Sequence, residues 1–165
     1  MSNMQQLLNT LPQIGKIEKI AIRPAKKADL LSLEQVNISI ENGLEGDHYR
    51  GSSRKRQITL IQAEHLEVVA KLLGKPQIEH NQIRRNIIVS GINLLALKDK
   101  TFQIGKNVTL EMTGLCHPCS RMEENLGTGG YNAMRGHGGI TAKVLTGGTI
   151  HIGDEVKLIV LGQTP

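Results

Sequence analysis

The chain has 165 residues and a mass of 18.1 kDa, which is the size of one ordinary domain. Hydrophobic residues make up 39% and charged residues 21%, proportions typical of a globular rather than a disordered chain. Aromatic residues make up only 2%, which argues against a nucleic-acid platform that stacks bases on rings. Two cysteines cannot build a disulfide framework, and the net charge of +5 suits anionic ligands.

The N-terminal segment lacks the basic and apolar regions of a secretory signal, and no stretch approaches the roughly 18 apolar residues of a membrane span. We therefore expect a cytoplasmic protein with reduced thiols and no membrane partner. Apolar residues recur at helical spacing from Met4 to Leu11 and stop at Pro12, so residues 1–13 are expected to form an N-terminal helical extension. Residues 14–162 are expected to form the domain.

Short apolar alternations recur along this domain. The first half contains expected strands at 14–22, 36–40, 57–61 and 87–89, and one helix at 63–73. In the second half, residues 102–110 and 150–158 share the pattern strand, Ile-Gly turn, strand. Residues 140–144 are expected to form a hairpin into Thr149 through Gly147 and Gly148. Many short strands with glycine turns and a few short helices indicate a mainly β, barrel-like single domain.

The most unusual segment is Cys116-His117-Pro118-Cys119. It follows an expected strand, and Pro118 suits the first turn of a helix that ends at Gly127. Cys119 would then lie in the first helical turn, where free amide groups, the helix dipole and the nearby Arg121 favour a thiolate. Such a thiolate is a nucleophile, a redox thiol or a ligand for a soft metal. His117 is a candidate catalytic proton donor.

Three other interpretations of the two cysteines remain open. They could be small buried hydrophobic side chains, because free cysteine packs well in a core. They could be half of a zinc site, although the six histidines supply no matching His-x-x-x-His pair. They could also be a thioredoxin-like redox pair, although that fold carries its motif in the first βα unit.

Six segments together carry a resemblance to a known family. They are Gly43–Asp47, Arg56–Ile61, Arg84–Ile87 with Gly91, Phe102–Gly105, Pro118–Met122 and Gly138–Ala142. In this order and spacing, the chain resembles the molybdenum cofactor sulfurase C-terminal (MOSC) domain in its small stand-alone bacterial form, over roughly residues 14–161. The resemblance implies a β-rich barrel with a few helices. It also implies binding of the molybdopterin-type molybdenum cofactor, with Cys119 as the sulfur ligand or sulfur carrier.

In relatives of this type, the centre reduces N-hydroxylated compounds such as hydroxylaminopurines, amidoximes and hydroxylamines. The resemblance therefore implies reduction of a small N-hydroxylated substrate, without pyridoxal phosphate. Electrons would come from a separate reductase, because no Gly-x-Gly-x-x-Gly element follows a strand to bind nicotinamide or flavin. The alternatives are a non-enzymatic molybdopterin or sulfur carrier that uses a Cys119 persulfide, and a Cys116–Cys119 thiol oxidoreductase. Nucleic acid is not an expected partner.

Basic residues are the candidates to bind the phosphate of such a cofactor, because guanidinium groups bind phosphate with two parallel hydrogen bonds. The candidate cofactor-binding residues are Arg56, Arg84, Arg85, Asn86, Arg121 and Arg135. We expect at least two of these arginines to line one open cleft with Cys119. Asp47 is expected to stabilise its turn by accepting from backbone N–H groups, and His65 and His80 are expected at the surface.

Overall fold

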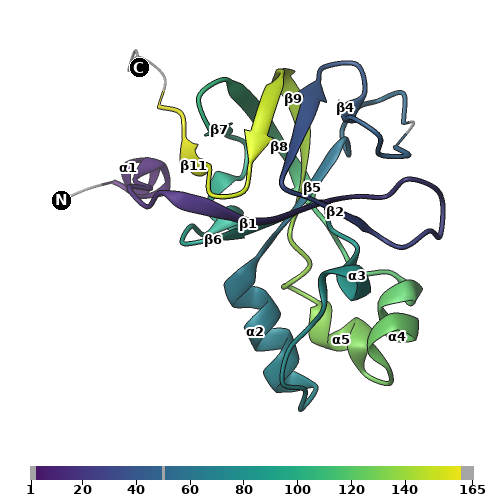
Figure 1. Cartoon of the computed structure of the whole chain (residues 1–165). Coiled ribbons are helices and arrows are strands. Elements are labelled where there is room, and N and C mark those ends of the chain that lie inside the picture. The colour runs from purple at the N-terminus through teal and green to yellow at the C-terminus, as the bar shows by residue number, and fades with distance from the viewer. Residues whose placement is uncertain (1–2, 50, 161–165) are drawn as a thin grey trace.

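In the computed structural model, which describes residues 3–49 and 51–160, seven β-strands close into a barrel and most helices gather at one end of it (Figure 1). The strands are β1 (Gly15–Ile22), β2 (Leu31–Leu33), β3 (Gln35–Ser39), β4 (Gly43–Leu44), β5 (Ile58–Gln62), β6 (Ile87–Ser90), β7 (Thr101–Ile104), β8 (Val108–Leu115), β9 (Ile140–Thr146), β10 (Gly148–His151) and β11 (Glu155–Leu158). The helices are α1 (Met4–Asn9), α2 (Ala63–Leu72), α3 (His80–Ile83), α4 (Ser120–Leu126) and α5 (Gly130–Met134), with a 3-10 turn η1 at Leu94–Leu97.

The barrel order is β1-β6-β5-β9-β8-β7-β11, and β11 pairs with β1 to complete the circle. All these pairs are antiparallel except β5 and β6, which are parallel because α2 and α3 connect them. The closing pair is short, with Gly15 opposite Val156 and Lys16 opposite Glu155. A second sheet, β10-β3-β4, packs Val36, Ile38 and Ile150 onto the barrel core. The mainly β, single-domain prediction is confirmed.

The helical end of the barrel has its own small core. Alternation along β5 and β6 directs Leu60 and Ile87 into the barrel, while Ile61 and Ile88 pack outward among the helices. Those outward residues contact the buried apolar faces of α2, α4 and α5. This packing fixes the start of α4, which follows the two cysteines, against the barrel wall. Among the described residues, no helix combines the length and apolar character needed to span a membrane.

The structure corrects three expectations about local structure. The expected hairpin from residues 140–144 into Thr149 is wrong, because β10 pairs with β3 in the second sheet. At Gly147 the backbone passes against the carbonyl of Ile38, too close for any side chain, and the chain changes sheets there. The matched segments therefore differ: β7 and β8 form a hairpin, whereas β10 and β11 lie in separate sheets.

The third correction concerns the helix after the cysteines, which begins at Ser120, two residues after Pro118, the residue expected in its first turn. Cys119 is the N-cap of α4, with an extended backbone (φ −125°, ψ 177°), and Pro118 lies before the cap. The first helical hydrogen bond of this end runs from the N–H of Met122 to the carbonyl of Cys119, at 2.9 Å. Helix α1 is present as expected and buries none of its residues. The expected domain end at residue 162 lies outside the described residues.

Candidate functional site

The two cysteines occupy opposite environments at the end of β8. Cys116 is 3% exposed, whereas Cys119 is exposed at the start of α4. Cys119 is the N-cap and precedes the free amide groups of the first helical turn, and its side chain makes no capping hydrogen bond to them. A buried and an exposed thiol three residues apart have different accessibility to any ligand. Cys119 is therefore the residue of this pair that can bind or react.

Arg85 holds the cysteine segment in place from inside the protein. Its guanidinium is buried, and Nε donates to the carbonyl of Gly138 at 2.8 Å, Nη1 to that of Ile83 at 2.9 Å and Nη2 to that of Cys116 at 3.3 Å. The N–H of Cys116 also donates to the carbonyl of Gly139, at 2.8 Å. A side chain at Gly138 would overlap the carbonyl of Cys116. The cysteine segment and the glycine loop thus pack backbone against backbone.

The thiols and the arginines around them are electrostatically coupled. Arg56 is exposed, and its Nη2 lies 3.9 Å from Sγ of Cys116. Burial lowers the pKa of the Arg85 guanidinium, and Arg56 and Arg23 lower it further, while Cys116 and Cys119 oppose that shift. The positive charges of Arg56 and Arg85 beside the cysteine segment suit an anionic ligand.

Asp47 stabilises the glycine turn as predicted. Its carboxylate accepts from the backbone N–H of Arg23 at 2.7 Å and of Tyr49 at 3.4 Å, and it pairs with Nη2 of Arg23 at 2.9 Å. Burial raises the pKa of Asp47, but the hydrogen bonds and charge of Arg23 outweigh burial and hold it below its usual range. The turn is consequently tied to the end of β1.

Asn86 is a fully buried link inside the barrel wall. Its Oδ1 accepts from the N–H and the hydroxyl of Thr59, both at 3.0 Å. Its Nδ2 donates to the carbonyl of Ala21 and to Oδ1 of Asp47, both at 3.3 Å. These partners occupy its amide, so Asn86 supports the site from within and lines no described cavity.

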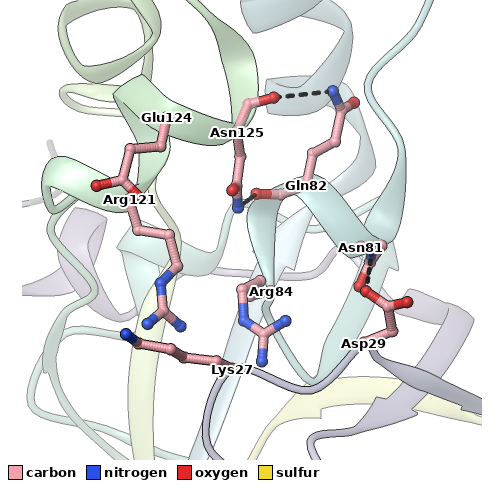
Figure 2. A pocket seen from close by; sticks show the side chains of 8 residues that line it. All are labelled: Lys27, Asp29, Asn81, Gln82, Arg84, Arg121, Glu124 and Asn125. Atoms are coloured by element: carbon pink, nitrogen blue, oxygen red, sulfur yellow. Dashed lines mark hydrogen bonds between the residues drawn. The ribbon is translucent and has the colours of Figure 1, made fainter.

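A polar pocket of about 360 Å³, here called the cation pocket, lies beside α4 (Figure 2). It is lined by Lys27, Asp29, Asn81, Gln82, Arg84, Arg121, Glu124 and Asn125. The charged ends of Lys27, Arg84 and Arg121 gather on one side of it in Figure 2. Within the described chain, none of these three cations forms an ion pair with a carboxylate.

Arg84 is the least satisfied of these cations. Its Nη2 is buried without a hydrogen-bond partner among the described residues. Burial lowers its pKa, and the neighbouring positive charges of Arg121 and Arg23 lower it further. A left-handed backbone (φ 57°) at the C-cap of α3 allows Arg84 and Arg85 to point in different directions. Converging, unpaired guanidinium groups of this kind suit an anion of the phosphate class.

A second pocket, here called the apolar pocket, has a volume of about 440 Å³. It is lined by Leu95, Lys98, Met112, Gly114, Leu115, Cys116, His117, Pro118, Gly136, Gly138 and Gly139. Residues 116–118 thus line the apolar pocket, whereas Arg121, Glu124 and Asn125 line the cation pocket. Cys119 lies between these two groups in the chain but lines neither pocket. The expected cleft that Cys119 shares with two arginines is therefore not found in these pockets, since Arg84 and Arg121 share the cation pocket without it. The described residues contain no cluster of three or more His, Cys, Asp or Glu side chains to hold a bare metal ion.

The candidate residues of the sequence thus separate into distinct groups. Arg84 and Arg121 meet in the cation pocket, Arg56 and Arg85 contact Cys116, and His117 lines the apolar pocket. Arg135 is exposed after α5, with Nη1 3.5 Å from Oδ1 of Asn132, and it lines neither pocket.

Sequence reasoning missed one cation and misplaced one histidine. Lys27 lines the cation pocket, and the basic run from Arg23 to Lys27 was the available signal. His80 was expected at the surface, which is wrong, because it is 7% exposed with Nε2 against the carbonyl of Arg85. His80 is the first residue of the short helix α3, which buries the ring against the backbone of Arg85. His65, half-buried, lies in an edge-to-face contact with His137.

Comparison with known proteins gives the same picture of the fold. The family model of the MOSC domain matches residues 45–157. The YuaD protein from Bacillus subtilis is similar in structure, with a TM-score of 0.76, 20% identity, and 89% of this chain and 97% of that one covered. YiiM from Geobacillus stearothermophilus has a TM-score of 0.72, 16% identity and coverage of 90% and 76%. YiiM from Escherichia coli has a TM-score of 0.65, 15% identity and coverage of 88% and 70%. No curated protein matches the chain.

Proposed function

Because the chain belongs to the MOSC domain family, we propose that it binds a molybdopterin-type molybdenum cofactor and reduces small N-hydroxylated compounds. One observation carries the proposal: an exposed cysteine, Cys119, lies in the chain between residues of a cation pocket and residues of an apolar pocket. A cofactor with a metal at one end and a phosphate at the other needs a thiolate and fixed positive charge close together. The substrate needs a separate space beside the thiolate.

The residues present fit such a cofactor. The Cys119 thiolate would be the protein ligand to the metal, because soft metals prefer sulfur. Lys27, Arg84 and Arg121 would bind the phosphate, and the unpartnered Nη2 of Arg84 would gain a hydrogen bond there. When bound, the cofactor supplies two-electron reduction chemistry. The buried Arg85, Asn86 and Asp47 keep these ligands in position without touching the cofactor.

His117 is the residue we assign to proton transfer. It is exposed and lines the apolar pocket, so it can hold a proton beside the substrate and be recharged from solvent. In the overall reaction the N–O bond breaks, two electrons and two protons are consumed, and an amine and water leave. His117 would protonate the departing oxygen, and the second proton would come from solvent. The electrons come from a separate flavin or iron–sulfur reductase, and we propose the cytoplasm as the location.

Metal analysis and an activity assay test this function together. The chain is expressed in a cofactor-producing host, and reduction of 6-N-hydroxylaminopurine is followed with a reduced viologen dye as electron donor. We expect about one molybdenum per chain, and we expect Cys119→Ser to lose both the metal and the activity. Cys116→Ser, a matched change at the buried thiol, should keep its molybdenum. Full molybdenum in Cys119→Ser, or a loaded protein without activity, would contradict the proposal.

The exposure of Cys119 also favours one second candidate, a sulfur carrier. In that function the Cys119 thiolate takes the terminal sulfur of a donor persulfide, and the donor leaves as a thiolate. A protein that accepts this sulfur but reduces no N-hydroxylated compound would be a carrier. A Cys116–Cys119 disulfide formed at physiological potential would instead indicate a thiol oxidoreductase.

A further inference from the structure

The apolar pocket differs from the rest of the site in the polarity of its walls. Leu95 and Leu115 are 38% and 46% exposed at this pocket, although large apolar side chains are usually buried. Met112 contributes a further apolar wall from β8. Apolar walls with a few polar groups are typical of pockets that bind small molecules. The pocket therefore has the character of a ligand site, distinct from the cation pocket, which shares none of its lining residues.

The charges at this pocket restrict its ligand. Among the described residues, no carboxylate lines it, and Lys98 and His117 are the basic side chains that do. A positively charged ligand would meet no opposite charge there, and it would be repelled by Lys98. An uncharged apolar ligand has little desolvation free energy to lose on entry, and removal of its apolar surface from water favours binding. The pocket thus favours neutral over cationic ligands.

Backbone contacts and an irregular strand fix part of the pocket wall. The register of β8 shifts between Met112 and Gly114, and Thr113 fixes this irregularity through hydrogen bonds to Thr141 and to the carbonyl of Lys55. On the opposite wall, Gly138 packs against the carbonyl of Cys116. Irregular strands next to a site re-aim the residues around them. This part of the wall is therefore formed before a ligand binds.

We propose that the apolar pocket binds the neutral, apolar body of the N-hydroxylated substrate and so sets substrate preference. This inference rests on the proposed function and adds a preference within its substrate class: compounds with an uncharged aromatic or branched apolar substituent are preferred. A body in this pocket would lie beside His117, and residues 116–118, which line the pocket, lead along the chain to Cys119. Polar or cationic substrates of the same reacting group bind less tightly.

The first test is direct binding, measured by ligand-observed NMR titration of the purified protein. Three probes separate the contributions: benzamidoxime, acetamidoxime, which lacks the apolar ring, and benzamidinium, a positively charged isostere. Burying an aromatic ring supports about tenfold or tighter binding of benzamidoxime than of the other two probes. Leu115→Glu and Leu95→Glu should weaken benzamidoxime binding about tenfold. Leu145→Glu, an equally exposed leucine outside the pocket, is the matched control and should bind like the unchanged protein.

The second test separates this inference from the proposed function. In the molybdenum-loaded protein, Leu115→Glu should lower the ratio of kcat/KM for benzamidoxime to kcat/KM for acetamidoxime about tenfold. Equal binding and an unchanged ratio in both glutamate variants would overturn the inference while the reductase function stands. A loaded protein that reduces neither probe overturns the proposed function, and with it the substrate role. Circular dichroism of each variant confirms that it is folded.

Discussion

The polar residues around the cysteines form two regions with different surroundings. A buried framework of Arg85, Asn86 and Asp47 bonds to backbone groups. A more accessible rim contains the exposed Cys119 and the pocket-lining residues His117, Lys27, Arg84 and Arg121. Neighbours in sequence fall on opposite sides of this division, as Arg84 and Arg85 do. The comparison teaches that a motif contains both residues that hold a site and residues that bind its ligand. Changes in the framework should reduce stability, and changes in the rim should reduce binding.

The largest expected effect is that of Gly138→Ala. The added methyl group overlaps the carbonyl of Cys116, so the loop must move away, and we expect a loss of about 3 kcal/mol or more of unfolding free energy. Urea denaturation measures it. Gly114→Ala is the matched control, because its methyl group would meet only the Thr141 hydroxyl, at 3.8 Å. Equal stability of the two variants would show that the close packing of the glycine loop is not required.

Arg85→Met should be the next most damaging change. It leaves the carbonyls of Ile83, Gly138 and Cys116 without this donor, which costs about 2–4 kcal/mol in total. The exposed Arg56 loses only its long contact with the Cys116 thiol, so Arg56→Met should change stability by less than about 0.5 kcal/mol. Thermal and urea unfolding of both variants measure the difference. An Arg85→Met protein as stable as the unchanged protein would show that the buried guanidinium of Arg85 is not needed to support the site.

Asp47→Asn should have a moderate, pH-dependent effect. The pKa of Asp47 is lowered in the folded protein, so its stabilisation is complete well above the ordinary value of 3.8 and is lost as the pH falls through the folded-state pKa. At neutral pH the substitution should cost about 1–3 kcal/mol, through loss of the buried pair with Arg23. Unfolding curves between pH 7 and pH 2 should converge for the two proteins. A constant difference at every pH would contradict this assignment.

The smallest effect on stability is expected for Arg121→Gln. Removing Arg121 relieves its repulsion of Arg84, so stability should change by less than about 0.5 kcal/mol. Binding should change much more. Inorganic phosphate should raise the melting temperature of the unchanged protein, and this rise should be lost in the variant. Arg135→Gln, at an arginine that lines neither pocket, is the control, and an equal phosphate response in all three proteins would exclude the cation pocket as the anion site.

The sequence predicted the strands better than their pairing. Alternating apolar residues mark the buried face of a strand, and a short turn between β7 and β8 leaves only one partner nearby. Residues 150–158 have the same pattern as 102–110, yet β10 pairs with β3, more than a hundred residues earlier. Local alternation carries no information about such a distant partner. The barrel class was therefore predictable, and the sheet change at Gly147 was not.

The candidate site likewise contains residues that local sequence signals predicted and residues that they did not. The sequence placed Cys119 at a helix start, because proline and a following charged run are local signals. It could not separate Arg84 from Arg85, since Arg84 itself takes the left-handed backbone at the C-cap of α3 that points the two side chains in different directions. Lys27 reaches the cation pocket from a loop far away in sequence, so no nearby motif identified it. Contacts between distant segments decided these positions.

The short closing pair between β1 and β11 has a consequence for how the chain folds. It joins Gly15 and Lys16 to Glu155 and Val156, so almost the whole chain must be in place before it forms. Closing such a long loop lowers the entropy of the chain, so this pair is expected to form late in folding. Proteins dominated by pairings between distant residues fold in milliseconds to seconds. The β7–β8 hairpin needs no such loop and can form early. We therefore expect the folding chain to form an open, curved sheet first. The pairing of β11 with β1 then closes the barrel in the final step.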